Sequence, residues 1–306
     1  MKKIMQACGF HCIKINNLGV KFGEQVVLDD VNLHIHCGSL NAIIGKNGAG
    51  KSTLIKAILG EIPHTGNIEF KDTKDGHMQK LKIGYVPQSI NIEKNTPVSV
   101  YDLIASYQFN YPVFLPKSKK IEAKIKETLR VFEAEHLIDK QVCKVSGGQL
   151  QRVLLSMAIM DEPNLLLLDE PVSGIDQKGM ELFYKTMDYL KSHFDLAIIL
   201  ISHDLDYVAK YANKVILLDK TIVKQGSVKE VFNSPEFEKT FYDDYGMKIR
   251  LTQYISDIKH VFTHREWRMH VYGGEVVDPA TRPMRDFYKL EEIEQLPVST
   301  AHLNVL

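Results

Sequence analysis

Residues 45–53 form a glycine-rich stretch whose spacing suits the binding of phosphate groups. The pattern is G-x-x-x-x-G-K-[S/T]; an apolar run, Leu40–Ile44, precedes it, and a helical pattern, Leu54–Leu59, follows it. Glycines let backbone N–H groups curl around phosphates, and the N-terminus of the helix adds positive potential. The chain is therefore expected to bind a nucleoside triphosphate through Gly45, Asn47, Gly48, Gly50, Lys51, Ser52 and Thr53.

Two acidic residues follow a fully apolar run, Leu165–Leu168. A phosphate loop works beside such a strand, because a carboxylate at the end of the strand completes the coordination of Mg²⁺. Asp169 suits that role together with the Ser52 hydroxyl, and Lys51 is expected to reach the β- and γ-phosphates. Glu170 is placed to orient and deprotonate an attacking water. The alternative is a strand whose polar end merely faces solvent.

A second candidate anion site lies at the start of a helical pattern after Val145. A serine hydroxyl, two residues without bulky side chains and free helix N–H groups can hold a phosphate. One nucleotide does not need two phosphate sites, so this one is expected to serve a nucleotide held by another copy of the chain. The alternative is a simple capped helix start. The residues concerned are Ser146, Gly147, Gly148 and Gln149.

Strand and helix patterns alternate through most of the chain, which indicates an α/β fold with a mainly parallel, buried core sheet. A helical subdomain is expected at about 98–160, and a C-terminal extension of unknown role at 246–306. Strands are predicted at 13–15, 26–28, 31–35, 40–44, 66–70, 83–86, 165–168, 196–201, 215–218 and 221–224. Helices are predicted at 54–59, 119–130, 149–160, 178–192 and 205–211.

Taken together, the motifs resemble those of the nucleotide-binding subunits of ATP-binding-cassette (ABC) transporters. The resemblance covers about residues 10–245 and rests on several motifs in family order and spacing. The matching segments are Gly45–Thr53 (Walker A), Gln88 (Q-loop), Ser146–Gln149 (signature), Asp169 and Glu170 (end of Walker B), Ser173–Asp176 (D-loop) and His203 (switch histidine).

The resemblance implies a P-loop NTPase with an antiparallel β subdomain, a helical subdomain and a head-to-tail dimer that closes on two ATP. Glu170, His203 and Gln88 would be catalytic, with His203 contacting the γ-phosphate. Mg²⁺ would be held by Ser52, Gln88 and Asp169.

The resemblance also implies a residue that contacts the adenine of ATP. The sequence departs from the family pattern in two motifs. Phe22 would stack on adenine through its ring face, and a place in the core is the alternative. Val145 in the signature and Gly174-Ile175 in the D-loop differ from the commoner residues. Neither change removes a chemical group, so an active ATPase is expected.

Several further segments are similar to the zinc- and manganese-uptake branch of the family. They are Val153–Ala158, Glu170–Gly179, Ser202–Val208 and the region from Gly226 to Gly246. In that branch the subunit drives an integral-membrane permease, which an extracytoplasmic metal-binding protein feeds. The permease would dock near Gln88 and Val98–Phe109, and the chain would act at the cytoplasmic face of the membrane.

Two other functions remain open at this stage. The chain could be a cassette for another nutrient or for efflux, with the same chemistry. It could also be a soluble cassette ATPase without a permease. Cassettes that act on ribosomes or DNA usually carry a second cassette, a coiled-coil insertion or zinc modules, and this sequence shows none of them.

Composition narrows the class of protein further. The 306 residues carry 38 Lys and Arg against 38 Asp and Glu, so no basic field indicates nucleic acid. The longest apolar runs are too short to cross a bilayer, and the start of the sequence lacks the apolar segment of a signal peptide. The four cysteines suit a reducing compartment, and Cys8, His11 and Cys12 lack the spacing of a zinc site.

Overall fold

The computed structural model describes residues 12–71, 73–74, 77–78, 81–90, 92–93, 95–112, 114–172, 177–237, 239–240, 249–262 and 265–276. The chain divides into two compact units, residues 1–228 and 229–306. Within the described ranges, no helix is long and apolar enough to cross a membrane.

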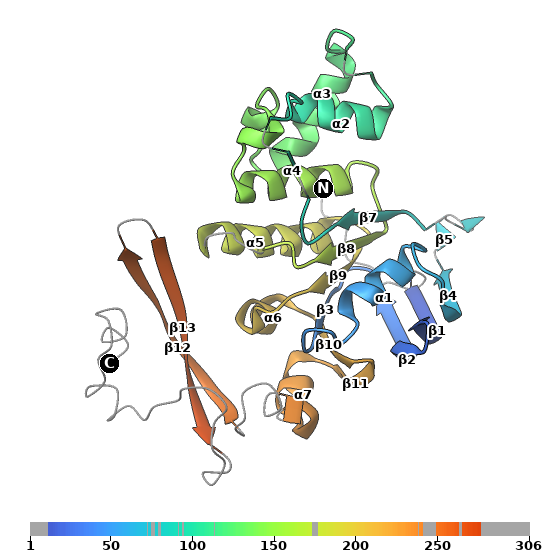
Figure 1. Cartoon of the computed structure of the whole chain (residues 1–306), viewed down its shortest axis with the longest axis vertical. Coiled ribbons are helices and arrows are strands. Elements are labelled where there is room, and N and C mark those ends of the chain that lie inside the picture. Colours follow the sequence, from blue (N-terminus) through green and yellow to red (C-terminus); the bar gives the residue numbers. More distant parts are fainter. Residues whose placement is uncertain are drawn as a thin grey trace. The chain divides into compact units, whose positions relative to one another are not determined.

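The first unit is built around a six-stranded sheet in the order β11-β10-β3-β9-β8-β7 (Figure 1). Five of these strands are parallel, and β11 pairs antiparallel with β10 at one edge. The strands are β3 (Leu40–Ile44), β7 (Ile83–Val86), β8 (Leu165–Asp169), β9 (Ala197–Ile201), β10 (Lys214–Asp219) and β11 (Thr221–Gly226). The predicted parallel core sheet is confirmed.

Both faces of this sheet are covered, which explains why β3, β8 and β9 are buried along their whole length. Leu165 and Leu167 of β8 face a core shared with helix α1 (Lys51–Ile58) and an antiparallel sheet. Leu166 and Leu168 face a second core on the opposite side. That second core contains residues of α4 (Gly147–Ile159), α5 (Gln177–His193) and α6 (Leu205–Tyr211).

The antiparallel sheet has the order β2-β1-β4. Its strands are β1 (Cys12–Phe22), β2 (Gln25–His36) and β4 (Thr65–Lys71). The prediction of two short strands at 26–28 and 31–35 is wrong, because β2 runs through both. The irregularity between them is Asp30, which has a positive φ of 47° and accepts hydrogen bonds from the side chains of Asn17 and Asn32. These bonds also lower the pKa of Asp30.

The helical subdomain has its own apolar core, formed by α2 (Val100–Phe109), α3 (Lys119–Val131), α4 and the short 3₁₀ turns η1 (Glu135–Leu137) and η2 (Val142–Lys144). Ser99 begins α2 and Ser146 begins α4, each with a capping box that satisfies free N–H groups of the first turn. A tight contact joins the subdomain to the sheet at Gly84, where a methyl group would lie 2.2 Å from the carbonyl oxygen of Ala158.

Short elements complete the first unit. Between the strands predicted at 66–70 and 83–86, β5 (Thr73–Lys74) pairs with β6 (His77–Met78). Cys143 is a free thiol, whereas Cys37 is disulfide-bonded, so the expectation of reduced cysteines is wrong for Cys37. Cys8 and His11 lie outside the described residues.

The second unit contains an antiparallel hairpin of β12 (Ile249–Phe262) and β13 (Arg265–Val276). Helix α7 (Val228–Phe232) lies at the boundary of the two units. The sequence predicted an extension here but no strands. Residues 277–306 lie outside the described part.

Candidate functional site: a phosphate loop beside two acidic strand ends

The phosphate loop joins the end of β3 to the start of α1. Gly45, Gly48 and Gly50 all have positive φ values, of 152°, 82° and 97°. A methyl group at Gly45 would lie 2.1 Å from the carbonyl oxygen of Leu218, and one at Gly50 would lie 2.5 Å from Leu28 Cδ2. The first and last glycines are therefore required both by backbone conformation and by packing.

Gly48 is required by conformation alone. No heavy atom lies within 4 Å of the position that a methyl group would take there, so the loop is open at this point. An open loop with left-handed backbone can turn its N–H groups toward an anion. This geometry fits the predicted binding of phosphates.

Lys51 lies over this loop. Its side chain is buried, with 6% of the residue exposed, and its ammonium group donates to the carbonyl oxygens of Gly45 at 2.7 Å and Lys46 at 2.8 Å. These bonds hold a positive charge at the loop, where phosphate oxygens would be its natural partners.

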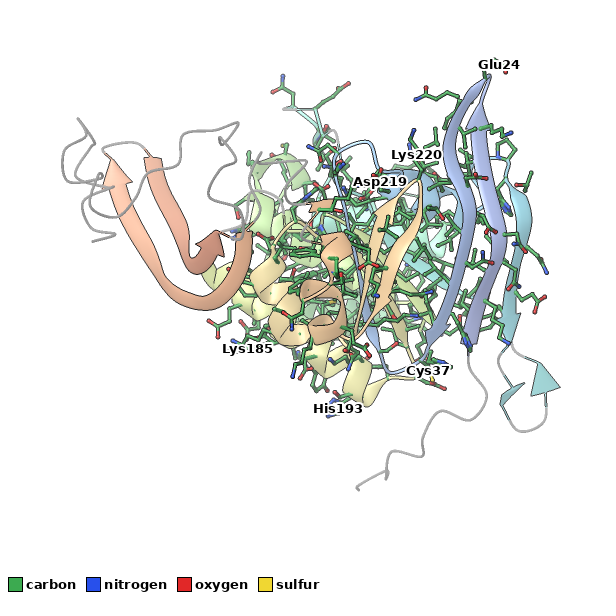
Figure 2. All side chains as sticks on the ribbon, turned by 90° about the horizontal axis from the view of Figure 1, so that it is seen from below. Glu24, Cys37, Lys185, His193, Asp219 and Lys220 are labelled. Carbon is green, nitrogen blue, oxygen red and sulfur yellow. The ribbon has the colours of Figure 1, made fainter. Side chains whose placement is uncertain are left out.

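The turn between β10 and β11 braces the loop, which the sequence did not predict. The amide of Lys220 donates to the carbonyl oxygen of Ala49, and the carbonyl oxygen of Lys220 accepts from Asp29 on β2, both at 2.9 Å. Asp219 approaches Lys46 at 3.8 Å. Figure 2 shows Asp219 and Lys220 at this turn. A polar turn between two strands was the only signal in the sequence.

Asp169 ends β8 and is joined to the phosphate loop by a hydrogen bond of 3.2 Å from the Ser52 hydroxyl. The carboxylate is buried, and burial raises its pKa; the bond from Ser52 opposes this shift, and the neighbouring Glu170 adds to it. Hydroxyl and carboxylate oxygens are the ligands that Mg²⁺ prefers. The predicted magnesium pair is therefore brought together and is chemically suited to the ion.

Glu170 connects two other predicted residues, Gln88 and His203. One carboxylate oxygen accepts from the Gln88 amide at 2.7 Å, and the other lies 2.8 Å from His203 Nε2. Its backbone has a φ of 46°, which a non-glycine residue rarely adopts, and its amide donates to the carbonyl oxygen of Ile201. A strained residue with convergent polar partners is typical of a functional site.

Two predicted groups stand outside this cluster. Ser146 and Gln149 bond each other as the capping box of α4. The ring of Phe22, at the end of β1, is 52% exposed, so the alternative of a core residue is wrong. The D-loop, Ser173–Asp176, lies outside the described residues.

Comparisons with known proteins agree with this geometry. Residues 28–173 match the family described as ABC transporter. The zinc import ATP-binding protein ZnuC 2 of Aliivibrio fischeri is 39% identical over 75% of this chain and 88% of its own length. The chain belongs to the ABC transporter family. It is an ATP-binding subunit that hydrolyses ATP.

Two more relatives support the assignment. The cassette shares 34% identity with the zinc import ATP-binding protein ZnuC of Mannheimia succiniciproducens, over 86% of this chain and 90% of that protein. Among solved structures, an ATP-binding cassette of an ABC transporter in its ADP conformation superposes with a TM-score of 0.65 at 26% identity. That match covers 76% of this chain and 98% of the other. The predicted fold class is thereby confirmed.

The burial of Asp169 leads to a prediction about stability. Because its pKa in the folded state is raised above the ordinary 3.8, the folded state binds more protons than the unfolded state between the two pKa values, and stability falls as the pH rises through that window. Asp169→Asn is expected to raise the melting temperature of the nucleotide-free chain at pH 7. Calorimetry checks this. The gain should shrink as the pH is lowered toward 3.8; a lower melting temperature at pH 7 would contradict the account.

Proposed function

We propose that this ATPase drives the import of a divalent transition metal, with zinc as the first candidate and manganese as the second, through a membrane permease. The observation that carries the chemistry is the Glu170 carboxylate held between Gln88 and His203, beside the Ser52–Asp169 pair. The relatives named for zinc import, at 39% and 34% identity, support the cargo. Import from outside would require an extracytoplasmic metal-binding protein, and the chain would act at the cytoplasmic face.

In this proposal Glu170 is the general base. It takes a proton from water as the water oxygen bonds to the γ-phosphorus and the bond to the β-phosphate oxygen breaks. Both carboxylate oxygens now have partners, Gln88 and His203. Each carboxylate oxygen can accept a second hydrogen bond, so a water can approach Glu170 while Gln88 and His203 stay in contact with it. The contact with Gln88 links the proposed base to the Q-loop.

Ser52, Asp169 and the carbonyl oxygen of Gln88 would hold Mg²⁺, whose charge neutralises phosphate oxygens during transfer. Lys51 would exchange the carbonyl oxygens of Gly45 and Lys46 for phosphate oxygens. The Phe22 ring, half exposed, is available to stack on adenine.

A second copy of the chain completes each site in this proposal. Ser146 and its neighbours open α4, which contributes to the apolar core of the helical subdomain. A methyl group at Gly147 would meet no heavy atom within 4 Å, so the helix start is accessible. An accessible helix N-terminus of this kind suits the phosphates of ATP held by the partner.

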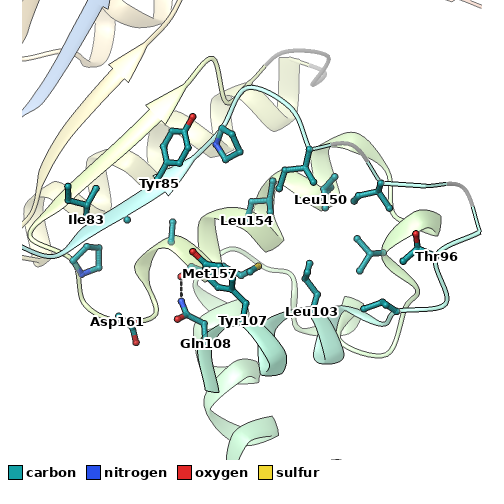
Figure 3. A pocket seen from close by; sticks show the side chains of 18 of the residues that line it. Ile83, Tyr85, Thr96, Leu103, Tyr107, Gln108, Leu150, Leu154, Met157 and Asp161 are labelled. Carbon is teal, nitrogen blue, oxygen red and sulfur yellow. Dashed lines mark hydrogen bonds between the residues drawn. The ribbon is translucent and has the colours of Figure 1, made fainter. Parts of the chain in front are cut away.

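An apolar groove of about 740 Å³ supports docking of a permease (Figure 3). It lies between β7 and helices α2 and α4, and Pro87 in its wall is the neighbour of Gln88. Tyr107 is 72% exposed and Ile90 is 41% exposed. Large exposed side chains that line an apolar groove are typical of a surface that binds a partner. A short helix of the permease seated here would press on the Q-loop and so sense the state of Glu170.

Removing the carboxylate tests the catalytic assignment. Glu170→Gln keeps the size of the side chain but lacks a base, so ATP should still bind while turnover falls by on the order of 10²-fold or more. We also expect a stable dimer with ATP, seen by sedimentation. Glu127→Gln, the same change on an exposed position of α3, is the control and should keep full activity. A Glu170→Gln chain that hydrolyses ATP normally would exclude Glu170 as the base.

The groove can be tested separately. Tyr107→Glu places a charge in an apolar surface and should abolish co-purification with the permease without changing ATP affinity. Tyr189→Glu, at a residue 49% exposed on α5, is the matched control. Retained co-purification of the Tyr107→Glu chain would place the docking surface elsewhere.

The cargo is tested in cells that lack the chain, grown with zinc or manganese scarce. We expect a selective fall in cellular zinc by elemental analysis, restored by the intact chain but not by Glu170→Gln. A selective fall in manganese would change the cargo. Unchanged metal contents would contradict metal import while leaving the ATPase assignment intact.

A further inference from the structure

A buried pair of hydroxyl groups holds the loop that carries His203. The phenol oxygen of Tyr184 on α5 lies 3.1 Å from the hydroxyl oxygen of Ser202. Ser202 Oγ also accepts the backbone N–H of Asp204 at 3.1 Å. Both side chains are buried, Tyr184 fully and Ser202 with 2% of its surface exposed. The Ser202 hydroxyl therefore links Ser202 and Asp204, the residues on either side of His203, to Tyr184.

The backbone of this loop is tied in two further places. The carbonyl oxygen of Ile201 accepts the amide of Glu170 at 3.1 Å, and the amide of Ser202 donates to the carbonyl oxygen of Ile43 at 3.4 Å. These bonds fix where the loop leaves β9. The hydroxyl pair holds the side chain of Ser202 from α5, which packs on the face of the sheet opposite to α1.

The ring of Tyr184 also fixes the helix that comes after the loop. It stacks on Tyr207 with centroids 4.8 Å apart and planes 10° from parallel, and on Tyr211 at 5.4 Å and 20°. Both partners belong to α6, which begins two residues after His203. Burial raises the pKa of Tyr184, so its phenol keeps a proton to donate throughout the neutral range.

His203 needs such support. Its side chain is 48% exposed, and the Glu170 side chain that it meets is 22% exposed. An exposed imidazole has other rotamers available, and its contact with Glu170 persists only if the backbone beneath it is held in place. Misplacing a reacting group by about 1 Å can cost on the order of 10²-fold in rate.

We infer that Tyr184 and Ser202 are positioning residues, which hold His203 in contact with Glu170 from beneath the loop. The inference rests on the proposed role of His203 and goes beyond it, because neither hydroxyl touches the nucleotide site. It also ties the loop to α5, the helix that begins seven residues after Glu170.

The test is the steady-state ATPase rate of the full-length chain. Tyr184→Phe keeps the stacked ring and removes only the hydroxyl, so kcat is expected to fall by on the order of ten-fold while KM for ATP changes less than about two-fold. Ser202→Ala should lower kcat at least as much, because it also removes the acceptor of the Asp204 amide, and Ser202→Thr should retain activity. The double variant should be no slower than Ser202→Ala, because that change already removes the bond to Tyr184.

A second measurement and a control variant distinguish the positioning role of Tyr184 from a merely structural role. The nitrogen-15 spectrum of the His203 ring, assigned with His203→Ala, should show one fixed tautomer in the unchanged chain and averaged signals in Tyr184→Phe. Tyr101→Phe is the matched control: Tyr101 is 1% exposed, and its phenol oxygen accepts the amide of Ser118 at 2.8 Å within the helical subdomain. It should lower the melting temperature comparably without changing kcat or the His203 spectrum.

The outcomes distinguish this inference from the proposed function. If His203→Ala retains full ATPase activity, the role assigned to His203 is wrong. If His203→Ala is inactive while Tyr184→Phe and Ser202→Ala keep normal kcat and the fixed tautomer, the positioning role is overturned and the catalytic assignment stands. A fall in kcat with an unchanged His203 spectrum, matched by Tyr101→Phe, would also overturn it.

Discussion

The register of three buried parallel strands is the constraint on which the site depends. Ile43 of β3 and Asp169 of β8 both pair with Ile201 of β9. Parallel strands end at one edge of a sheet, so the phosphate loop, the two acids and His203 begin at the same level. A slip of one residue in any of the three strands would turn its side chains to the wrong face and separate the groups.

The site contains features that lower the stability of the folded chain. Asp169 is buried beside a second carboxylate, and burial raises its pKa; Glu170 adopts a left-handed backbone conformation. Such features persist because the surrounding structure determines them, here through the apolar strand behind Asp169 and the bond from Glu170 to Ile201. A bound cation and nucleotide would relieve the charge, which explains why an ATPase retains a costly carboxylate.

The same sheet separates the surfaces that the proposed function requires. One edge presents the candidate nucleotide site, while β7 and the helical subdomain form the apolar groove beside the Q-loop. Gln88 follows β7 by two residues and bonds Glu170, so in the proposed function a change in the groove would reach the proposed base through a short segment. The hydroxyl pair of Tyr184 and Ser202 supports the opposite partner of Glu170.

The sequence alone predicted the phosphate loop, the acidic strand end and the main elements. Lys51, Ser52, Asp169 and Glu170 could be proposed because phosphate and Mg²⁺ binding demand particular residue types at short spacing. The β7 strand and α5 were predicted to within a residue, because their apolar periodicity is local. Only the tertiary structure decided which distant residues meet, such as Gln88 and Glu170, which lie 82 residues apart. Hydrogen bonds of this kind depend on angles and distances set by packing, which residue spacing does not encode.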